Sequence, residues 1–475
     1  MSKFNKTTSI KTVNKCGHAA YAMRDKEKLV TQVLCSFFDE KKFYGDNSKE
    51  MQETIKRVIK SDPRFVASLA VFARREFNMR SVAHVLTAYL AHEVEGKPYT
   101  RKTVKAVSLR GDDITEIMAC YISMFGKPIP NALKKGINDV LQTFDEYTLA
   151  KYKGEGKAVK MRDLLCLCRP TPKTEEQSEM WKRLLENKLE IPYTWETELS
   201  AKGNNKETWE ALIESGKVGY MATLRNLRNI LKANPSNVNK VLDHIQNPEA
   251  VKKSKQLPFR FLSAYKELEN IGGSRVFDAL ENAVEASIEN MPKLEGTTVI
   301  AVDVSGSMGD KISAKSSVRC SEIAMLLGLM ANKICDNSVF YTFDSRIRKH
   351  AFSHRSGILS SAMETPNGGA TYMHLPFEKM IEDKINADRI IVLTDNMCNG
   401  GWNTKPIQVY ADQYRRETGN DIWVHAIDLV GYGTQQFHGA KTNVIAGWSE
   451  RTLEFIKLAE QGEGNLEKTI EEYIY

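Results

Sequence analysis

The stretch Thr297-Thr298-Val299-Ile300-Ala301-Val302-Asp303-Val304-Ser305-Gly306-Ser307-Met308 decides the fold of the C-terminal third of the chain. Its first half is a run of β-branched and apolar residues, which is typical of a strand buried on both faces. Its second half places one Asp and two Ser directly after that strand. Residues 316–333 then predict a helix, and further strands are predicted at 338–343, 389–394 and 422–429. Strands that alternate with helices indicate a doubly wound parallel sheet.

Polar side chains are expected to meet at one edge of that sheet. Ligands of doubly wound sheets bind beyond the carboxyl ends of the strands, which is the predicted place of Asp303, Ser305, Ser307 and Asp395. Two carboxylates and two hydroxyls are hard oxygen ligands that suit Mg²⁺ best and also Mn²⁺. We therefore predict a divalent cation site. The alternative is a turn in which Ser and Gly only cap the next helix.

The Asp-x-Ser-x-Ser motif at the end of an apolar strand resembles the metal-ion-dependent adhesion site of von Willebrand A domains. In that family a third loop contributes a Thr, and the segment Gly-Gly-Ala-Thr at 368–371 supplies Thr371, displaced by one residue from the commoner Gly-Gly-Thr. The resemblance implies a cation with one position open for a partner's carboxylate. No Ser/His/Asp order, P-loop or Gly-rich nucleotide loop accompanies the motif. We therefore expect that the protein is not an enzyme.

Length and composition fit a cytoplasmic protein of more than one domain. A chain of 475 residues is too long for a single hydrophobic core. The apolar run at 323–331 is far shorter than the ~20 residues that cross a bilayer, and the N-terminus lacks the apolar segment of a signal peptide. The eight cysteines have no zinc-site spacing. We expect reduced thiols and no contact with a membrane.

The basic charge belongs to the N-terminal part of the chain. Residues 1–290 contain 48 Lys and Arg against 37 Asp and Glu, whereas residues 291–475 contain 19 against 23. A basic part joined to an acidic one is what a polyanion-binding protein would have. Ordinary variation of surface charge is the alternative explanation.

The same N-terminal part predicts stacked helices. In residues 64–73 the apolar side chains fall on one helical stripe, and Asp62-Pro63 precedes it as a cap and first turn. Similar segments follow at 81–94, 112–124, 131–144, 208–215, 218–233 and 258–268. Short amphipathic helices with brief connections are typical of an α-solenoid with degenerate repeats. We expect an N-terminal segment at 1–25, a helical module at 26–290 and the metal-binding domain at 291–475.

Basic residues concentrate at several joints between these helices. One cluster contains Lys151, Lys153, Lys157, Lys160 and Arg162; the others contain Arg225 with Arg228, and Lys252 with Lys253 and Lys255. Each cluster taken alone is better explained as a solvated helix face than as a binding site.

A helical basic module followed by this type of domain resembles the Ro ribonucleoprotein family, whose helical module is called TROVE. The segments that carry the resemblance are 206–212 (KETWEAL), 222–227 (ATLRNL), Pro258-Phe259, and 163–165 (DLL) with Pro172 nearby. The resemblance implies a HEAT-like helical ring closed by the von Willebrand A domain. It also implies a monomer, because one chain closes the ring.

The resemblance further implies an RNA-binding function. Family members bind small noncoding Y RNAs on the basic outer surface and single-stranded ends of misfolded RNAs in the central hole, and they act in RNA quality control. Lys151 and Lys157 match the stretch where the family presents basic contacts. Arg169 stands where animal relatives have His, which keeps a hydrogen-bond donor and adds a permanent charge. Some bacterial relatives also dock an exoribonuclease, which is a candidate partner.

Two alternatives stay open at the level of sequence. The first is a metal-dependent protein-interaction scaffold that binds no RNA. The second is an RNA-processing enzyme whose carboxylates are not adjacent in sequence.

Overall fold

The computed structural model describes residues 11–35, 47–289, 291–311, 316–353, 356–399, 405–447, 449, 451–462 and 466–473. The chain divides into two compact units. The sheet unit contains Met1–Asp39 and Asn204–Leu466, and the helical unit contains Glu40–Gly203 and Glu467–Tyr475. Among the described helices, none combines the length and the apolarity that crossing a membrane requires.

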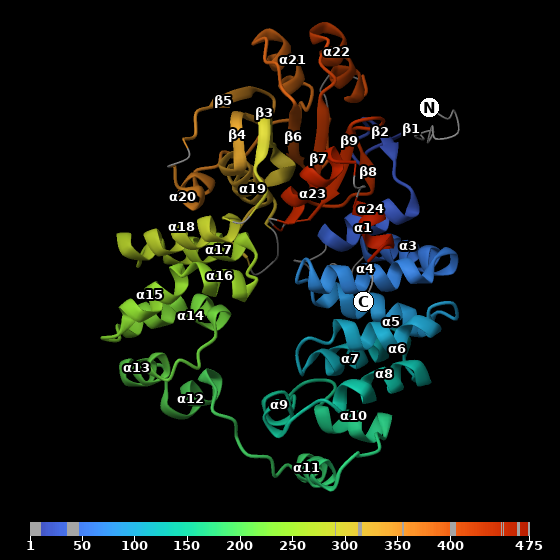
Figure 1. Cartoon of the computed structure of the whole chain (residues 1–475), viewed down its shortest axis with the longest axis vertical. Coiled ribbons are helices and arrows are strands. Elements are labelled where there is room, and N and C mark those ends of the chain that lie inside the picture. The colour runs from blue at the N-terminus through green and yellow to red at the C-terminus, as the bar shows by residue number, and fades with distance from the viewer. Residues whose placement is uncertain are drawn as a thin grey trace. The chain divides into compact units, whose positions relative to one another are not determined.

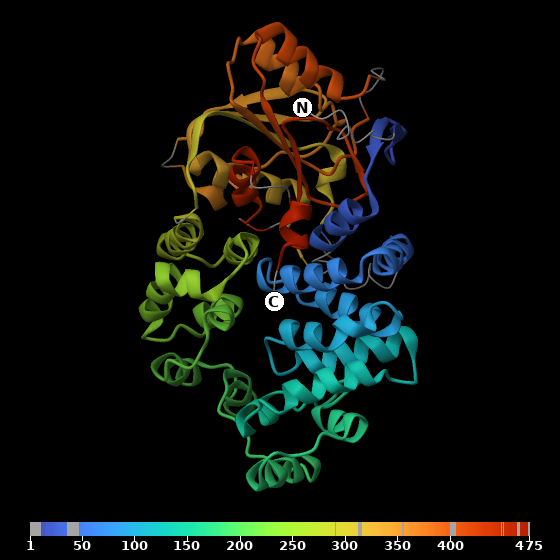
Figure 2. The same cartoon turned by 45° about the vertical axis from the view of Figure 1, so that its right-hand side comes forward.

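The helical unit is a stack of short antiparallel helices (Figures 1 and 2). Helix α4 packs on α5 and α6, α5 packs on α7, and α6 packs on α8, so each helix buries its apolar stripe against the next pair. The helices are α3 (Asn47–Ser61), α4 (Pro63–Arg75), α5 (Ser81–His92), α6 (Lys97–Val107), α7 (Asp113–Phe125), α8 (Asn131–Leu141), α9 (Glu146–Lys151), α10 (Met161–Cys168), α11 (Glu175–Leu185) and α12 (Trp195–Lys202).

A side-chain cap starts α4 where the sequence predicts it. The Asp62 carboxylate accepts a hydrogen bond from the Phe65 amide at 3.0 Å, and Pro63 occupies the first helical position of α4. The last described residues of the chain return to this unit, because Tyr473 stacks edge-on against Phe72 with 5.3 Å between ring centroids. The Tyr473 hydroxyl also donates to Glu76 Oε1 at 2.7 Å.

The sheet unit begins with helices and ends with an α/β domain. Its first helix, α1, is followed after the helical unit by six more that pack as pairs, and α18 contacts α15, α16 and α17. These helices are α1 (Asp25–Cys35), α13 (Lys206–Glu214), α14 (Tyr220–Ala233), α15 (Val238–Gln246), α16 (Pro248–Ser254), α17 (Pro258–Leu268) and α18 (Ser274–Ile288).

The main sheet has six strands in the order β5-β4-β3-β6-β7-β9. All neighbours run parallel except β5, which pairs antiparallel with β4. The strands are β3 (Leu294–Asp303), β4 (Cys335–Phe343), β5 (Ile347–His350), β6 (Arg389–Thr394), β7 (Trp423–Asp428) and β9 (Thr442–Ala446).

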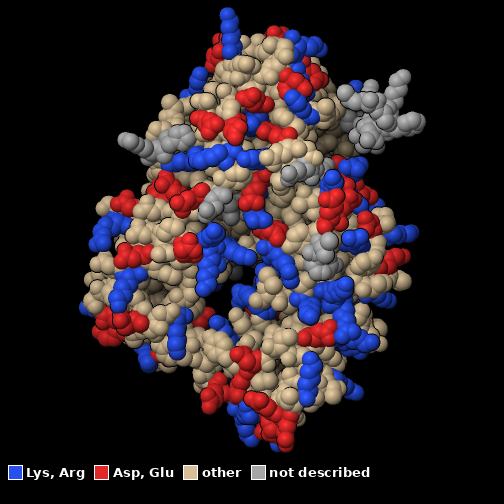
Figure 3. Space-filling view, in the orientation of Figure 1, with Lys and Arg blue, Asp and Glu red and all other residues tan. Residues whose placement is uncertain are grey.

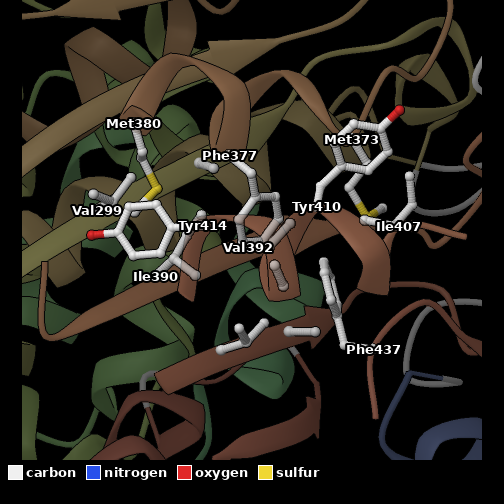
Figure 4. Close-up of a cluster of buried hydrophobic side chains, with 14 of the residues drawn as sticks. Val299, Met373, Phe377, Met380, Ile390, Val392, Ile407, Tyr410, Tyr414 and Phe437 are labelled. Atoms are coloured by element: carbon white, nitrogen blue, oxygen red, sulfur yellow. The ribbon is translucent and has the colours of Figure 1, made fainter. Parts of the chain in front are cut away.

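Helices cover both faces of this sheet. Val299 and Ala301 face a buried aromatic cluster contributed by α21 (Leu375–Glu382) and α22 (Gln408–Thr418), which includes Phe377, Tyr410 and Tyr414 (Figure 4). The alternate residue Val302 faces α19 (Cys320–Ile334), where a Cβ on Gly328 would lie 2.8 Å from Val302 Cγ2. A side chain at position 328 would therefore push α19 off the sheet. The remaining elements of the α/β domain are η2 (Gly306–Gly309), α20 (Ile358–Met363) and α23 (Arg451–Glu460). Helix α24 (Leu466–Glu471) falls, except for its first residue, in the helical unit.

A second, small sheet joins the N-terminal segment to the α/β domain. Strands β1 (Lys11–Val13), β2 (Ala19–Ala22) and β8 (Thr434–Gln435) form an antiparallel sheet in the order β1-β2-β8. Next to it, α1 packs on β9, and the Cys35 thiol donates to the backbone oxygen of Asp428 at 3.2 Å. Residues 11–35 are thus part of the core around the sheet.

The predicted elements are present, and their ends differ in places. The predicted helix at 316–333 begins only at Cys320, because the Glu322 carboxylate accepts the Arg319 amide at 2.9 Å and fixes the first turn there. The predicted strand at 422–429 is one residue shorter at each end. Strands β1, β2, β5, β8 and β9 were not predicted; each has five residues or fewer.

Candidate metal centre and basic surface

The carboxylate of Asp303 is held at the carboxyl end of β3. Asp303 is fully buried; its Oδ1 accepts the Ser305 amide at 2.9 Å, and its Oδ2 accepts the Thr394 hydroxyl at 2.7 Å. Strands β3 and β6 are parallel neighbours, so Thr394 and Asp395 end their strand beside Asp303. The predicted convergence of Asp303 and Asp395 is therefore present.

The two serines lie next to these carboxylates. Ser305 is buried, and its hydroxyl is 3.3 Å from the Ser307 hydroxyl. The Ser307 hydroxyl interacts with Asp395 and lowers the pKa of that carboxyl. Asp395 is fully buried; its Oδ1 accepts the Met397 amide at 2.9 Å, and its Oδ2 accepts no hydrogen bond from the described residues.

The third loop lies against the first one and brings Thr371 with it. The Gly306 amide donates to the Gly369 oxygen, and the Gly368 amide donates to the Val304 oxygen, both at 3.0 Å. Thr371 itself is almost fully buried, and its amide donates to Asn399 Oδ1 at 3.2 Å in the loop that follows Asp395. The extra residue before Thr371 is accommodated by Gly368 and Gly369, which both have positive φ.

The electrostatics of the site favour a cation. Burial, together with the neighbouring Asp395, raises the pKa of Asp303 to about 7. Burial and the nearby Asp428 likewise raise the pKa of Asp395 to about 6, against the hydrogen bonds from Met397 and Ser307. Two buried carboxylates side by side are costly without a positive charge. The unpaired Asp395 Oδ2, the two serine hydroxyls and Thr371 are oxygen donors that fit a divalent cation.

The basic residues predicted to contact RNA fall into two classes. Four of them form ion pairs: Lys157–Glu116 at 2.6 Å, Lys160–Glu155 at 3.2 Å, Arg162–Asp163 at 3.9 Å and Arg228–Glu267 at 3.1 Å. The other four have no described carboxylate within ion-pair distance, namely Lys151, Lys153, Arg169 and Arg225. Figure 3 shows a further group of Lys and Arg side chains over α16, where the sequence has Lys252 and Lys253.

Comparison with protein families places both modules. The model of the TROVE domain matches residues 16–187 and 182–304, and the model of the Ro60 vWA domain matches residues 297–442. The chain belongs to the Ro family. The helical repeats and the von Willebrand A domain that the sequence predicts are thereby confirmed.

Curated relatives of this Ro-family chain are distant in sequence. Telomerase protein component 1 of Rattus norvegicus is 24% identical over 343 residues, which cover 52% of this chain and 13% of that protein. RNA-binding protein RO60 of Deinococcus radiodurans is 26% identical over 234 residues, which cover 45% of this chain and 43% of that protein. The chain thus matches less than half the length of either relative.

The fold of this Ro-family chain is also that of a solved relative. The crystal structure of the Deinococcus radiodurans Ro (RSR) protein superposes with a TM-score of 0.63 at 18% identity, covering 93% of this chain and 100% of that one. At this level of identity the match shows the shared fold of helical repeats and von Willebrand A domain.

Two residues around the candidate metal centre of this Ro-family chain could not be found from motif spacing. The Asn14 amide donates to the backbone oxygens of Asn396 and Cys398, at 3.2 and 2.6 Å, and so holds the loop that follows Asp395. Asp428 is a third buried carboxylate at the end of β7. An Asp that ends an apolar strand is a usable signal for Asp428, whereas no signal marks Asn14.

Proposed function

We propose that this protein binds RNA as Ro proteins do, taking small structured Y-like RNAs on its basic surface. The observation that carries the proposal is the continuous match to both Ro modules, from residue 16 to residue 442. One matched relative is named an RNA-binding protein. Duplex RNA is recognised mainly through its backbone charge and shape, which suits exposed cations better than a pocket.

Among the predicted RNA contacts, Lys151, Lys153, Arg169 and Arg225 are the most available to phosphate, because no described carboxylate lies within ion-pair distance of them. A Lys or Arg already paired with a carboxylate loses that partner when it binds RNA, and the carboxylate left behind repels the RNA. Lys151, Lys153 and Arg169 carry no such cost, and all three lie between α9 and the end of α10. Arg169 is exposed and ends α10 with a positive φ of 48°.

The finer parts of the proposal follow the family. Single-stranded ends of misfolded RNAs would be a second ligand class, taken up by the central hole of the ring that Ro proteins form, in noncoding RNA quality control. We further propose a monomer in the cytoplasm that carries out no catalysis itself, with an exoribonuclease as candidate partner. All eight cysteines lie in the described part of the chain and none of them forms a disulfide, which agrees with a reducing compartment.

We propose that the von Willebrand A domain binds Mg²⁺, or Mn²⁺ in its place, through Asp303, Ser305, Ser307, Thr371 and Asp395. The cation would neutralise the two carboxylates and offer an open position to an acidic partner. This centre also supports the second candidate function, a metal-dependent interaction scaffold, because Asp395 Oδ2 is left without a hydrogen bond. Two results together would favour the scaffold. The wild type would retain no RNA, and the Asp303→Ala variant would no longer bind the protein partner that the wild type binds.

The first experiment is to purify the protein from its own cells, crosslink it, and sequence the retained RNA at several salt concentrations. Enrichment of a defined small structured RNA supports the proposal, and no enrichment over a mock purification overturns it. The variant Lys151/Lys153/Arg169→Ala should weaken binding and reduce the salt slope by about 2 to 3, since each phosphate contact contributes ~0.9.

The control variant Lys157/Lys160/Arg162→Ala removes the same charge from the same part of the chain, but from cations that are already paired. It should bind more tightly than the first variant. Equal loss in the two variants would mean that net charge alone decides binding.

A further inference from the structure

Helix α9 exposes an aromatic side chain beside Lys151. Tyr147 is 49% exposed and lies on the first turn of α9. Lys151, one turn later, places its Nζ 5.5 Å from the centroid of the Tyr147 ring and 3.4 Å from its hydroxyl. An exposed ring beside a cation is a common helix-surface pair, so further observations are needed to distinguish a binding site.

The first such observation is a second ring near the same cation. Lys151 Nζ is 5.6 Å from the centroid of the Tyr152 ring, and the Arg110 guanidinium carbon is 5.7 Å from that centroid. Two aromatic rings and two cations therefore alternate over this small surface. Aromatic rings among cations are the arrangement that binds single-stranded RNA, because bases stack on the rings while phosphates meet the charges.

The second observation is that the backbone beneath these rings is fixed. The Asp145 carboxylate caps α9 by accepting the Thr148 amide at 2.8 Å, and Glu146 forms a two-point ion pair with Arg183 at 2.6 and 3.2 Å. The Tyr152 ring lies directly on Gly111, where an added Cβ would come within 2.4 Å of the ring. A rigid platform loses little entropy when a base stacks on it.

We propose that Tyr147 is a stacking platform for an unpaired base of a bound RNA, with Lys151 beside the phosphate of that nucleotide. The inference rests on the proposed RNA-binding function and deepens it. The side chains of Lys153 and Arg169 would contact the phosphates of an RNA duplex. Tyr147 would then favour RNAs in which an unpaired nucleotide adjoins that duplex. Stacking tolerates every base, so the site would select the presence of an unpaired nucleotide over its identity.

The test uses the full-length protein and three fluorescein-labelled RNAs. The first is a blunt hairpin, the second is the same hairpin with a short adenosine tail, and the third has a tail of abasic nucleotides. Fluorescence anisotropy gives the dissociation constants for the wild type, Tyr147→Phe and Tyr147→Ala. Tyr193→Ala is the matched control, since Tyr193 is another exposed tyrosine, at 39%.

Loss of one stacked base corresponds to a weakening of about fivefold to a hundredfold. We expect Tyr147→Ala to show this loss on the adenosine-tailed hairpin and no loss on the blunt or abasic-tailed RNA. Tyr147→Phe should bind within about twofold of the wild type, because it keeps the ring. Thermal unfolding of all variants should be unchanged, since the Tyr147 side chain is half exposed.

The remaining outcomes separate the two proposals. If the wild type binds none of the RNAs, the RNA-binding function fails and the stacking site fails with it. If the wild type binds and Tyr147→Ala behaves like Tyr193→Ala, the stacking site alone is overturned. A phenylalanine variant as weak as the alanine variant also overturns it, because the hydroxyl and not the ring would then be the contact.

Discussion

Asp395 is the residue on which the metal proposal depends most directly. Its buried carboxylate lies beside Asp303 and has one oxygen without a hydrogen bond, so in the absence of a cation it destabilises the fold. We predict that Asp395→Asn unfolds at a higher temperature than the wild type in EDTA. The same variant should lose the rise in unfolding temperature that Mg²⁺ gives the wild type by binding the folded state. Differential scanning calorimetry with and without Mg²⁺ measures both effects.

Asp388→Asn is the control for that experiment. Asp388 precedes β6, whereas Asp395 follows it. The Oδ2 of Asp388 accepts the Thr297 amide at 2.7 Å. This variant should lose some stability and keep the full response to Mg²⁺. An equal Mg²⁺ response in Asp395→Asn would rule out the proposed ligand set.

His425 predicts how stability depends on pH. Its ring is fully buried; Nδ1 faces the Asn443 amide at 3.2 Å, and Nε2 faces Glu460 Oε1 at 3.0 Å. Burial lowers the pKa of His425 below its usual 6.5, although Glu460 opposes that shift. Burial would raise the pKa of Glu460, but hydrogen bonds from His425 and Arg389 outweigh it and lower that pKa to about 2.

Both groups therefore bind fewer protons in the folded state than in the unfolded state. Unfolding takes up protons below pH 6.5 at His425 and below about pH 4.5 at Glu460, so the contribution of these two groups to stability falls as the pH falls. The raised pKa values of Asp303 and Asp395 act in the opposite direction, but they are common to the wild type and to His425→Gln. We therefore expect the urea midpoint of the wild type to decrease relative to that of His425→Gln from pH 7.5 to pH 5.5, because Gln does not titrate. Parallel curves for the two proteins would contradict this assignment.

At the scale of elements, the contact between α18 and α20 makes a quantitative prediction. Glu281 accepts the amides of Ile358, Leu359 and Ser360 at 2.8, 3.0 and 2.9 Å, so a residue of one helix caps the start of another. Glu281→Gln should cost about 1–2 kcal/mol, the range for a lost cap and its dipole interaction. Urea unfolding measures this loss.

Glu285→Gln provides a matched comparison on the same helix. Glu285 is one turn from Glu281 and forms a 2.6 Å ion pair with Lys333. The Glu285 side chain is 46% exposed. A surface pair of this kind contributes ~0–1 kcal/mol. A larger loss in Glu285→Gln than in Glu281→Gln would show that the cap is not the stabilising contact.

The elements also show what sequence can and cannot predict. Strand β6 matches its predicted bounds, because five consecutive apolar or β-branched residues after Arg389 leave little choice of structure. Strand β3 starts three residues earlier than predicted, since the register shifts between Leu294 and Thr297, where Gly296 has positive φ. Strand β8 has two residues and exists only because β2 pairs with it, so no local pattern encodes it.

The same division applies to the metal centre. Asp303, Ser305 and Asp395 were predictable, because each follows directly from a strand whose end is visible in the sequence. Asn14 was not, because it reaches the loop after Asp395 from 382 positions away in the chain. The fold alone brings that contact about.

At the scale of the whole molecule, the chain cannot be divided at residue 290 without loss. A fragment of residues 291–475 lacks Asn14 and α1, and it lacks Lys266, whose Nζ pairs with the buried Glu322 at 2.8 Å. We predict that this fragment aggregates or unfolds at a much lower temperature than the full chain, and that residues 1–290 supplied in trans restore it. Size-exclusion chromatography and thermal unfolding test this. A monomeric fragment as stable as the full chain would contradict it.

The return of Tyr473 to α4 has a consequence for how the protein is made. Helix α4 leaves the ribosome early, but its partner Tyr473 is synthesised almost 400 residues later. At translation rates of about 5–20 residues per second this interval is about 20–80 seconds. During that time Phe72 and Glu76 lack their final contact. Helix α4 must therefore remain able to accept Tyr473 throughout that interval.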